Sequence, residues 1–258
     1  SEINFAVLVA SLIVASTPLV LAALGELIVE KSGVLNLGVE GMMIIGAVAG
    51  FIVGVETGSA YIGMIAAAVA GALLSLLFAF IILIMQANQV ASGLALTIFG
   101  LGIAALMGHP YTGIKSPQIS TISIPILSEI PILGTMFFQH DLIVYLSLIS
   151  VLTIWYFLTR MRAGLILRSV GEDHDVAHSL GYRVITIRFL AIVFGGAMAG
   201  VGGGYLSLFR VPQWTEGMTA GAGWIALALV VFSGWRPFRL LIGCLLYTSP
   251  SPRDLSES

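Results

Sequence analysis

The sequence predicts an all-α fold, a polytopic helical membrane protein with about seven apolar segments, some of them short or broken helices. The chain has 258 residues, of which 58% are hydrophobic and only 9% are charged, and its mean hydropathy is +1.05. An ordinary soluble domain carries about a quarter charged residues. The apolar residues also come in long runs, several of them close to the roughly 20 residues that a helix needs to cross the hydrocarbon core. A β-barrel would alternate polar and apolar side chains instead.

Seven apolar segments follow one another along the chain, with an interrupted eighth run over 238–246. They cover residues 3–24, 41–55, 59–85, 89–107, 140–158, 188–209 and 222–234. The segments 41–55 and 222–234 are too short to cross a membrane alone, so we expect each to be a broken or re-entrant helix. Short segments flanked by glycine are where the sites of transporters tend to lie.

The basic residues predict the orientation in the membrane, because short loops rich in Lys and Arg stay on the cytoplasmic side. The loop 159–188 is therefore cytoplasmic, since it carries Arg160, Arg162, Arg168, Arg183 and Arg188. Alternation of sides then places the segment 108–139 and the N-terminus outside. The same alternation places residues 25–40 inside, although Lys31 is outnumbered there by acidic residues.

The two ends of the sequence lead to two further expectations. The chain starts without an initiator Met or a basic region, so we expect the first apolar segment to be a membrane span rather than a cleaved signal. Residues 1–243 form the predicted transmembrane domain. Residues 244–258 end in a polar, Pro-rich stretch that cannot continue a helix, and we expect this tail to be foreign and the natural protein to be truncated at its C-terminus.

Composition excludes several classes of function. The net charge of −2 with eleven basic residues provides no basic surface for nucleic acid. Cys244 is the only cysteine, which excludes a disulfide framework and a thiolate zinc cluster. His174 and His178 are four residues apart, but no third ligand is near them, so we expect no metal. The chain also lacks the pattern of a Ser-His-Asp triad, so we expect neither catalysis nor a cofactor bound by this chain.

Two segments carry glycine at every fourth position, which places the glycines on one face of a helix. Such a face lets a neighbouring backbone approach closely, and this matters in lipid, where hydrophobicity does not drive helix association. The simplest interpretation is helix packing without a direct role in function. The residues concerned are Gly46, Gly50, Gly54, Gly196, Gly200 and Gly204.

A short helix is predicted within the cytoplasmic loop. Ser169 and Glu172 have the spacing of a capping box, and Gly181 is suited to the position after a helix end. Val176, Ala177 and Leu180 would form a small apolar stripe among acidic residues and histidines. Such a helix suits docking into a groove on another protein, and the alternative is a solvated helix with no partner.

The polar segment 25–43 separates the first two apolar runs. Asn36 and Glu40 lie in a stretch too apolar for an external loop, and polar residues at membrane depth face protein or a water-filled cavity. These two residues, with the adjacent Gly41 and Met42, are therefore candidates for the path of a polar solute. The alternative is that Glu40 caps the helix beginning at Gly41. Asn88 and Gln89 form a weaker case, because they could simply end one helix and start the next.

Three strings carry a resemblance to a known family: EKSGVLNLGVEGMMIIGA (30–47), RSVGEDHDVAHSLGYRV (168–184) and GGAMAGVGGGYLSL (195–208). They resemble the permease subunits of bacterial ABC importers in the branched-chain amino acid, ribose and nucleoside superfamily, most closely the nucleoside or simple-sugar branch. The resemblance implies a multi-pass protein of the bacterial cytoplasmic membrane. It also implies a small polar solute, a nucleoside first and a simple sugar next.

The resemblance further implies three kinds of protein partner. These are cytoplasmic ATPase subunits that bind ATP and Mg²⁺, a second permease subunit that forms a heterodimer, and an extracytoplasmic solute-binding lipoprotein. Residues 36–42 match the broken second span near the translocation path. The segment that couples to the ATPase is implied to contain Gly171, Glu172, Asp173, His174, Val176, Ala177, Leu180 and Gly181.

A second interpretation from the residues is a stand-alone secondary transporter or channel. Such a protein carries membrane-embedded acids that bind coupling ions, and Glu40 is the only good candidate. The chain contains no nucleotide-binding loop of the type G-x-x-x-x-G-K-[ST], so ATP would have to act on another chain.

Overall fold

The structure is a computed structural model that describes residues 4–119 and 121–250. Within these residues, six helices are long and apolar enough to cross a membrane. They are α1 (Phe5–Lys31), α2 (Val39–Thr57), α3 (Ala60–Ala79, continued by a π-helical turn at Phe80–Ile84), α4 (Gln89–Gly108), α6 (Leu142–Arg160) and α9 (Val184–Tyr205, continued by a π-helical turn at Leu206–Arg210). Two shorter apolar helices follow, α10 (Ala222–Phe232) and α11 (Pro237–Thr248). The predicted all-α polytopic fold is confirmed.

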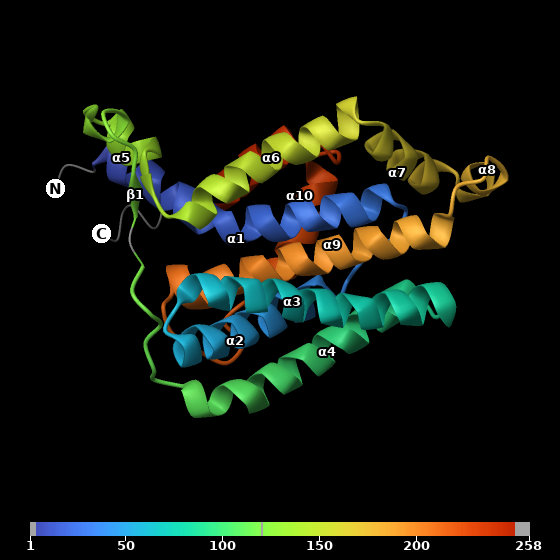
Figure 1. The fold of residues 1–258 in the computed structure, drawn as a ribbon, viewed down its shortest axis with the longest axis horizontal. Coiled ribbons are helices and arrows are strands. Elements are labelled where there is room, and N and C mark those ends of the chain that lie inside the picture. The colour runs from blue at the N-terminus through green and yellow to red at the C-terminus, as the bar shows by residue number, and fades with distance from the viewer. Residues whose placement is uncertain (1–3, 120, 251–258) are drawn as a thin grey trace.

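The remaining elements gather at the two ends of this bundle (Figure 1). At one end lie η2 (His109–Tyr111), η3 (Leu127–Glu129), α5 (Leu133–Phe137) and a two-stranded antiparallel sheet of β1 (Ile122–Ser123) and β2 (Gln139–His140). At the other end lie α7 (Arg162–Glu172) and α8 (His174–Ser179), which carry most of the basic loop. The segment predicted outside and the loop predicted inside are thus at opposite ends of the molecule.

Several helix boundaries differ from the sequence-based expectation, and three of them bear on the site or on the expected tail. The first helix does not stop at Leu24 but runs to Lys31, so Glu26 lies inside α1 and is 1% exposed. The second helix begins at Val39 rather than Gly41, which places Glu40 in its first turn. The last helix continues to Thr248, two residues beyond the expected end of the apolar run. Residues 251–258 of the predicted tail lie outside the described residues.

The core of the bundle is a close contact among α2, α3 and α9. A Cβ atom added at Gly46 would collide with the carbonyl of Gly200, and one added at Gly203 would collide with the carbonyl of Met43. Gly71 of α3 contacts the same part of α9. Such small residues let the backbones of neighbouring helices touch. The resulting van der Waals contacts stabilise the bundle, because the hydrophobic effect does not drive helix association in lipid. The structure places all six glycines of the two predicted faces against a neighbouring helix; besides Gly46 and Gly200 these are Gly50, Gly54, Gly196 and Gly204.

Two helices begin inside the bundle rather than at its ends. Gly46 is the eighth residue of α2, whereas its contact Gly200 is the seventeenth residue of α9. Because these helices run in the same direction, α2 starts about nine residues, or roughly 14 Å, deeper than α9. The N-terminus of α10 lies beside that of α2, since Gly223 contacts Glu40. We call α2 and α10 the half-helices because both start inside the bundle; of the two segments expected to be too short for a span, only α10 is too short, whereas α2 with 19 residues is long enough to cross a membrane.

Candidate functional site

The segment that connects α1 to α2, residues 32–38, turns back into the bundle from the end of α1. At the turn, Arg188 of α9 donates a hydrogen bond from Nε to the carbonyl of Ser32 at 2.9 Å. Gly33 adopts φ +89° and contacts Gly171 of α7, a position that suits glycine because the φ is left-handed. The turn thus rests on α7 and α9, and the chain then turns back into the bundle.

Side chains from other helices satisfy the backbone of this re-entrant segment. Gln89 Oε1 accepts from the Leu35 N–H, and Glu26 Oε1 accepts from the Asn36 N–H, each at 3.1 Å. The carbonyl of Leu37 accepts from Thr97 Oγ1 at 3.1 Å and from Trp224 Nε1 at 3.2 Å. An unpaired backbone group at membrane depth would cost several kcal/mol. These contacts explain how a non-helical segment is stable at this position.

Glu40 joins the two half-helices. Its carboxylate accepts from Thr219 Oγ1 at 2.6 Å, from the Gly221 N–H at 2.9 Å and from the Gly223 N–H at 2.7 Å. The side chain is 3% exposed. Glu40 therefore caps α10 from the first turn of α2, and its negative charge lies at the positive ends of both helix dipoles.

The other residues that were predicted to line the solute path contact neighbouring parts of the protein. Asn36 is buried, its Oδ1 accepts from the Gly38 N–H at 2.9 Å, and its Nδ2 lies 3.2 Å from the sulfur of Met42. Gly41 packs against the backbone of Thr97 in α4. Asn88 caps α4 by accepting from the Ala91 N–H at 2.9 Å. The cap predicted as an alternative for Glu40 exists, but it closes α10 rather than a helix that starts at Gly41.

Sequence reasoning did not single out four residues of this site: Glu26, Thr97, Thr219 and Trp224. Thr219 and Trp224 lie 179 and 187 residues from their partners in the chain. Nothing local in the sequence relates them to the helix break. Glu26 was visible as an acid beside an apolar run, but its place inside a buried helix became apparent only from the extent of α1.

The loop 159–188, which the sequence predicts to be cytoplasmic, holds two short helices instead of the single one that was expected. Ser169 is not an N-cap, because it lies within α7 and donates to the carbonyl of Leu165. The cap is Asp173, which has extended backbone angles and accepts from the N–H groups of Asp175 and Val176, each at 3.1 Å. Gly181 follows the end of α8 with φ +90°. The predicted capping box is therefore wrong, and the helix start moves from Ser169 to Asp173.

The apolar stripe predicted on this loop is only partly exposed to solvent. Ala177 is buried, whereas Val176 and Leu180 are 52% and 69% exposed. Among the described residues, no group of three or more His, Cys, Asp and Glu side chains could hold a metal ion. What the loop offers to a partner is a pair of apolar side chains on a short capped helix.

Comparisons with known proteins show the family to which this bundle of apolar helices belongs. A family model described as the branched-chain amino acid transport system permease component matches residues 8–249. The chain belongs to this family. It is therefore a transmembrane permease subunit, and it is a multi-pass protein of the cytoplasmic membrane.

The chain is also similar to three named permeases. The putative glucose ABC transporter permease protein TsgC13 of Haloferax volcanii is 42% identical over 90% of this chain and 72% of its own length. The guanosine ABC transporter permease protein NupQ of Bacillus subtilis is 34% identical over 93% of this chain and 79% of its own. The nucleoside permease protein NupC of Lactococcus lactis is 31% identical over 93% and 80%. No solved structure matches the chain significantly.

Proposed function

We propose that this permease subunit provides the path for a neutral polar solute, a nucleoside or a simple sugar, in an ATP-driven importer. The names of the three relatives support this solute class, since two refer to nucleosides and one to glucose. The single observation that carries the choice of a neutral solute is the position of the Glu40 carboxylate.

Facing half-helix N-termini at membrane depth are a ready site for an anion, because both dipoles present their positive ends. In transporters built on this principle, such ends bind the carboxylate of the substrate. Here the Glu40 carboxylate already accepts three hydrogen bonds from the start of α10. A free amino acid would have to place its own carboxylate against that negative charge. A nucleoside or a sugar carries no such charge, so it is not repelled.

The partners proposed for this subunit are cytoplasmic ATPase subunits, an extracytoplasmic solute-binding lipoprotein and a second, different permease subunit. The helix α8 is the proposed contact for the ATPase. The exposure of Val176 and Leu180 supports this role, because a short helix with free apolar side chains fits a groove on another protein. ATP hydrolysis on the partner would then bias the bundle between inward- and outward-facing packings.

Uptake into proteoliposomes tests the proposal. The complete natural permease would be reconstituted with its ATPase and binding protein, and the uptake of labelled guanosine, glucose and leucine would be compared with and without ATP inside. We expect ATP-dependent uptake of guanosine or glucose and little uptake of leucine. A preference for leucine would overturn the neutral-solute proposal. Uptake that persists without the ATPase would support the stand-alone transporter instead.

A further inference from the structure

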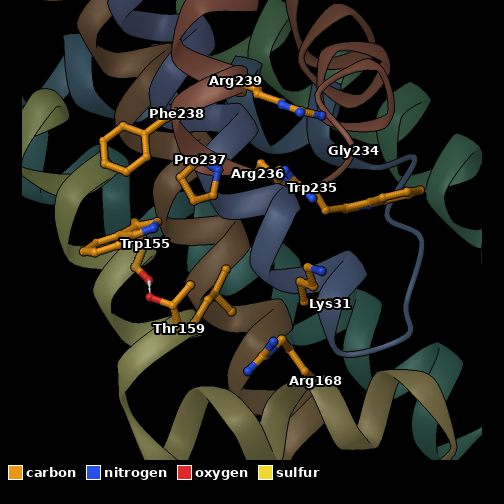
Figure 2. Close-up of a pocket in the computed structure, with 11 residues that line it drawn as sticks. Lys31, Trp155, Thr159, Arg168, Gly234, Trp235, Arg236, Pro237, Phe238 and Arg239 are labelled. Carbon is orange, nitrogen blue, oxygen red and sulfur yellow. Dashed lines mark hydrogen bonds between the residues drawn. The ribbon is translucent and has the colours of Figure 1, made fainter.

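A pocket of about 620 Å³ opens at the end of the bundle that carries α7, just beyond the C-terminal end of α10. Its walls come from the end of α1, the last turns of α6, the middle of α7 and the turn between α10 and α11 (Figure 2). Four basic side chains and several aromatic ones line it. The basic residues are Lys31, Arg168, Arg236 and Arg239; we call them the basic cluster.

No ion pair joins the basic cluster to a carboxylate in the described part of the chain, although the carboxylate of Glu30 lies beside Trp235 at the pocket and its Oε2 is buried without a hydrogen-bond partner. There, no side chain of the cluster lies within 4.0 Å of an Asp or Glu oxygen. Glu172 is near Lys31, but so are Arg168 and Arg236. Like charges gathered in a half-enclosed space repel one another with little screening by water. The cluster would therefore be stabilised by an anion.

Arg168 provides a second, independent sign of a missing partner. Its Nε is buried and finds no acceptor among the described residues. A buried donor without an acceptor costs about 1 to 3 kcal/mol or more when it is charged. The guanidinium lies beside Lys31 at the wall of the pocket (Figure 2). Its planar fork of donors matches the oxygens of a phosphate group.

The other walls indicate the source of the phosphate. Trp155 and Phe238 pack against each other with ring centroids 5.7 Å apart, and Trp235 is 37% exposed at the rim. Tryptophan is enriched where a protein crosses the headgroup region. The cytoplasmic leaflet holds anionic lipids, and basic pockets between helices on this side bind their headgroups. A soluble anion, unlike a lipid, has no acyl chains that could pack against the aromatic side chains of the walls.

We propose that this pocket binds the phosphate of an anionic phospholipid from the cytoplasmic leaflet. Arg168 and Lys31 contact the phosphate from the inner wall, and Arg236 and Arg239 contact it from the N-cap and first turn of α11. Trp155 and Phe238 lie along the first carbons of the acyl chains. The site is separate from the solute path, and it ties the α10–α11 turn to α1 and α7.

The test measures lipid binding to the purified ABC complex in nanodiscs of phosphatidylcholine with a minor share of phosphatidylglycerol. Native mass spectrometry counts the phosphatidylglycerol that stays bound. Each contact between an arginine of the pocket and the phosphate contributes about 1 kcal/mol or more, or at least about fivefold in affinity. The double variant Arg236→Gln/Arg239→Gln should therefore bind phosphatidylglycerol about 30-fold more weakly. The matched control Arg160→Gln/Arg162→Gln removes two exposed arginines at the same membrane face and should bind it normally.

Each remaining outcome decides the proposal. Unchanged binding by the pocket variant, or an equal loss in both variants, would overturn it. Phosphatidylglycerol should also raise the melting temperature of the native complex and not that of the pocket variant, because a ligand stabilises only the state that binds it. If glycerol phosphate or inorganic phosphate gives the same stabilisation in pure phosphatidylcholine, the ligand is a soluble phosphate and the lipid proposal is wrong. Loss of the ATPase from the pocket variant with normal lipid binding would assign the pocket to a protein partner.

Discussion

At the scale of single residues, Glu40 is the side chain that connects the two halves of the broken region. It accepts three hydrogen bonds from the start of α10 while it belongs to the first turn of α2. Two helix starts that would otherwise repel each other share one carboxylate. The same residue therefore stabilises the fold and, on the proposed solute path, would set the charge that a passing solute meets.

Glu40→Gln should destabilise the protein, because the amide keeps the shape but removes the charge and turns an NH₂ group toward N–H donors. Hydrogen bonds to a charged group contribute about 1.5 to 3 kcal/mol each. We expect a loss of about 2 kcal/mol, seen as an apparent melting temperature roughly 4 to 8 °C lower in detergent. The control Glu129→Gln changes an exposed glutamate outside the bundle and should leave the melting temperature nearly unchanged. Equal effects of both substitutions would contradict the cap.

The sequence could indicate the polar residues of this site but not their partners. Asn36 and Glu40 stand out because a polar residue is costly within an apolar membrane segment and therefore indicates a function or a structural contact. Whether these residues bind a solute or cap a helix depends on Thr219 and Trp224. These two partners approach only after the chain has folded back from α9 into α10. Sequence spacing carries no information about such a contact. The interpretation of Glu40 as a cap was available from the residues, but the helix that it caps was not.

At the scale of elements, the contact among α2, α3 and α9 depends on the absence of side chains. The backbone of Gly200 occupies the place where a Cβ of Gly46 would lie. Backbone cannot move aside as a flexible side chain can. The spacing of the glycines predicted that they share a helix face, since that follows from helix geometry. Which helix packs against this glycine face depends on the packing of the whole bundle.

Gly46→Ala should therefore separate α2 from α9 and destabilise the bundle by about 1 to 3 kcal/mol, the usual cost of overpacking. The measurement is the melting temperature together with the yield of monodisperse protein. Gly102→Ala is a matched control in α4, because nothing lies within 4 Å of the added Cβ. We expect the control to be neutral or slightly stabilising, as alanine is the better helix former. An unchanged melting temperature for Gly46→Ala would mean that the backbones of α2 and α9 are not in close contact.

The break between α7 and α8 changes how the proposed ATPase contact should be tested. Charge reversal at Asp173 would remove the N-cap of α8 as well as a surface charge. A lost interaction could then reflect an unfolded helix. The sequence predicted a helix here because Ser169, Glu172 and Gly181 fit a capping pattern. It missed the break because Asp173, with φ −152°, caps a separate helix by accepting from the N–H groups of Asp175 and Val176.

Val176→Ser/Leu180→Ser leaves the cap of α8 intact and removes its two exposed apolar side chains. Burying a Val or Leu side chain contributes about 1.5 to 3 kcal/mol, so co-purification of the ATPase should fall at least tenfold. Leu127→Ser is the control, because this leucine is also exposed, at 40%, but at the opposite end of the molecule. Normal recovery of the ATPase with the α8 variant would assign the docking surface elsewhere.

At the scale of the whole molecule, hydropathy predicted nearly all of the spanning helices, because lipid demands long apolar runs and helical backbone bonding. Of the two segments that were expected to be too short for a span, 41–55 became the 19-residue helix α2, which is long enough to cross, and 222–234 became the 11-residue helix α10, which is not. Their depth could not be predicted, since it depends on the parallel packing of α2 on α9 and on the fold-back of residues 211–221. The extent of α1 was also missed, because Glu26 resembles a loop residue until its contact with Asn36 is known.

The orientation of this bundle gives the last prediction. The basic end with α7 and α8 should face the cytoplasm, and the end with β1 and β2 should face outside. Single cysteines would be placed at Ser179 and Thr121, both exposed and at opposite ends, in a Cys244→Ala background. A membrane-impermeant maleimide should label Thr121→Cys in right-side-out vesicles and Ser179→Cys only in inside-out ones. Cys244 itself is buried, so the parent chain provides a background with little labelling. The reverse pattern would place α8 outside, where no ATPase could reach it, and the phospholipid site would then lie in the outer leaflet.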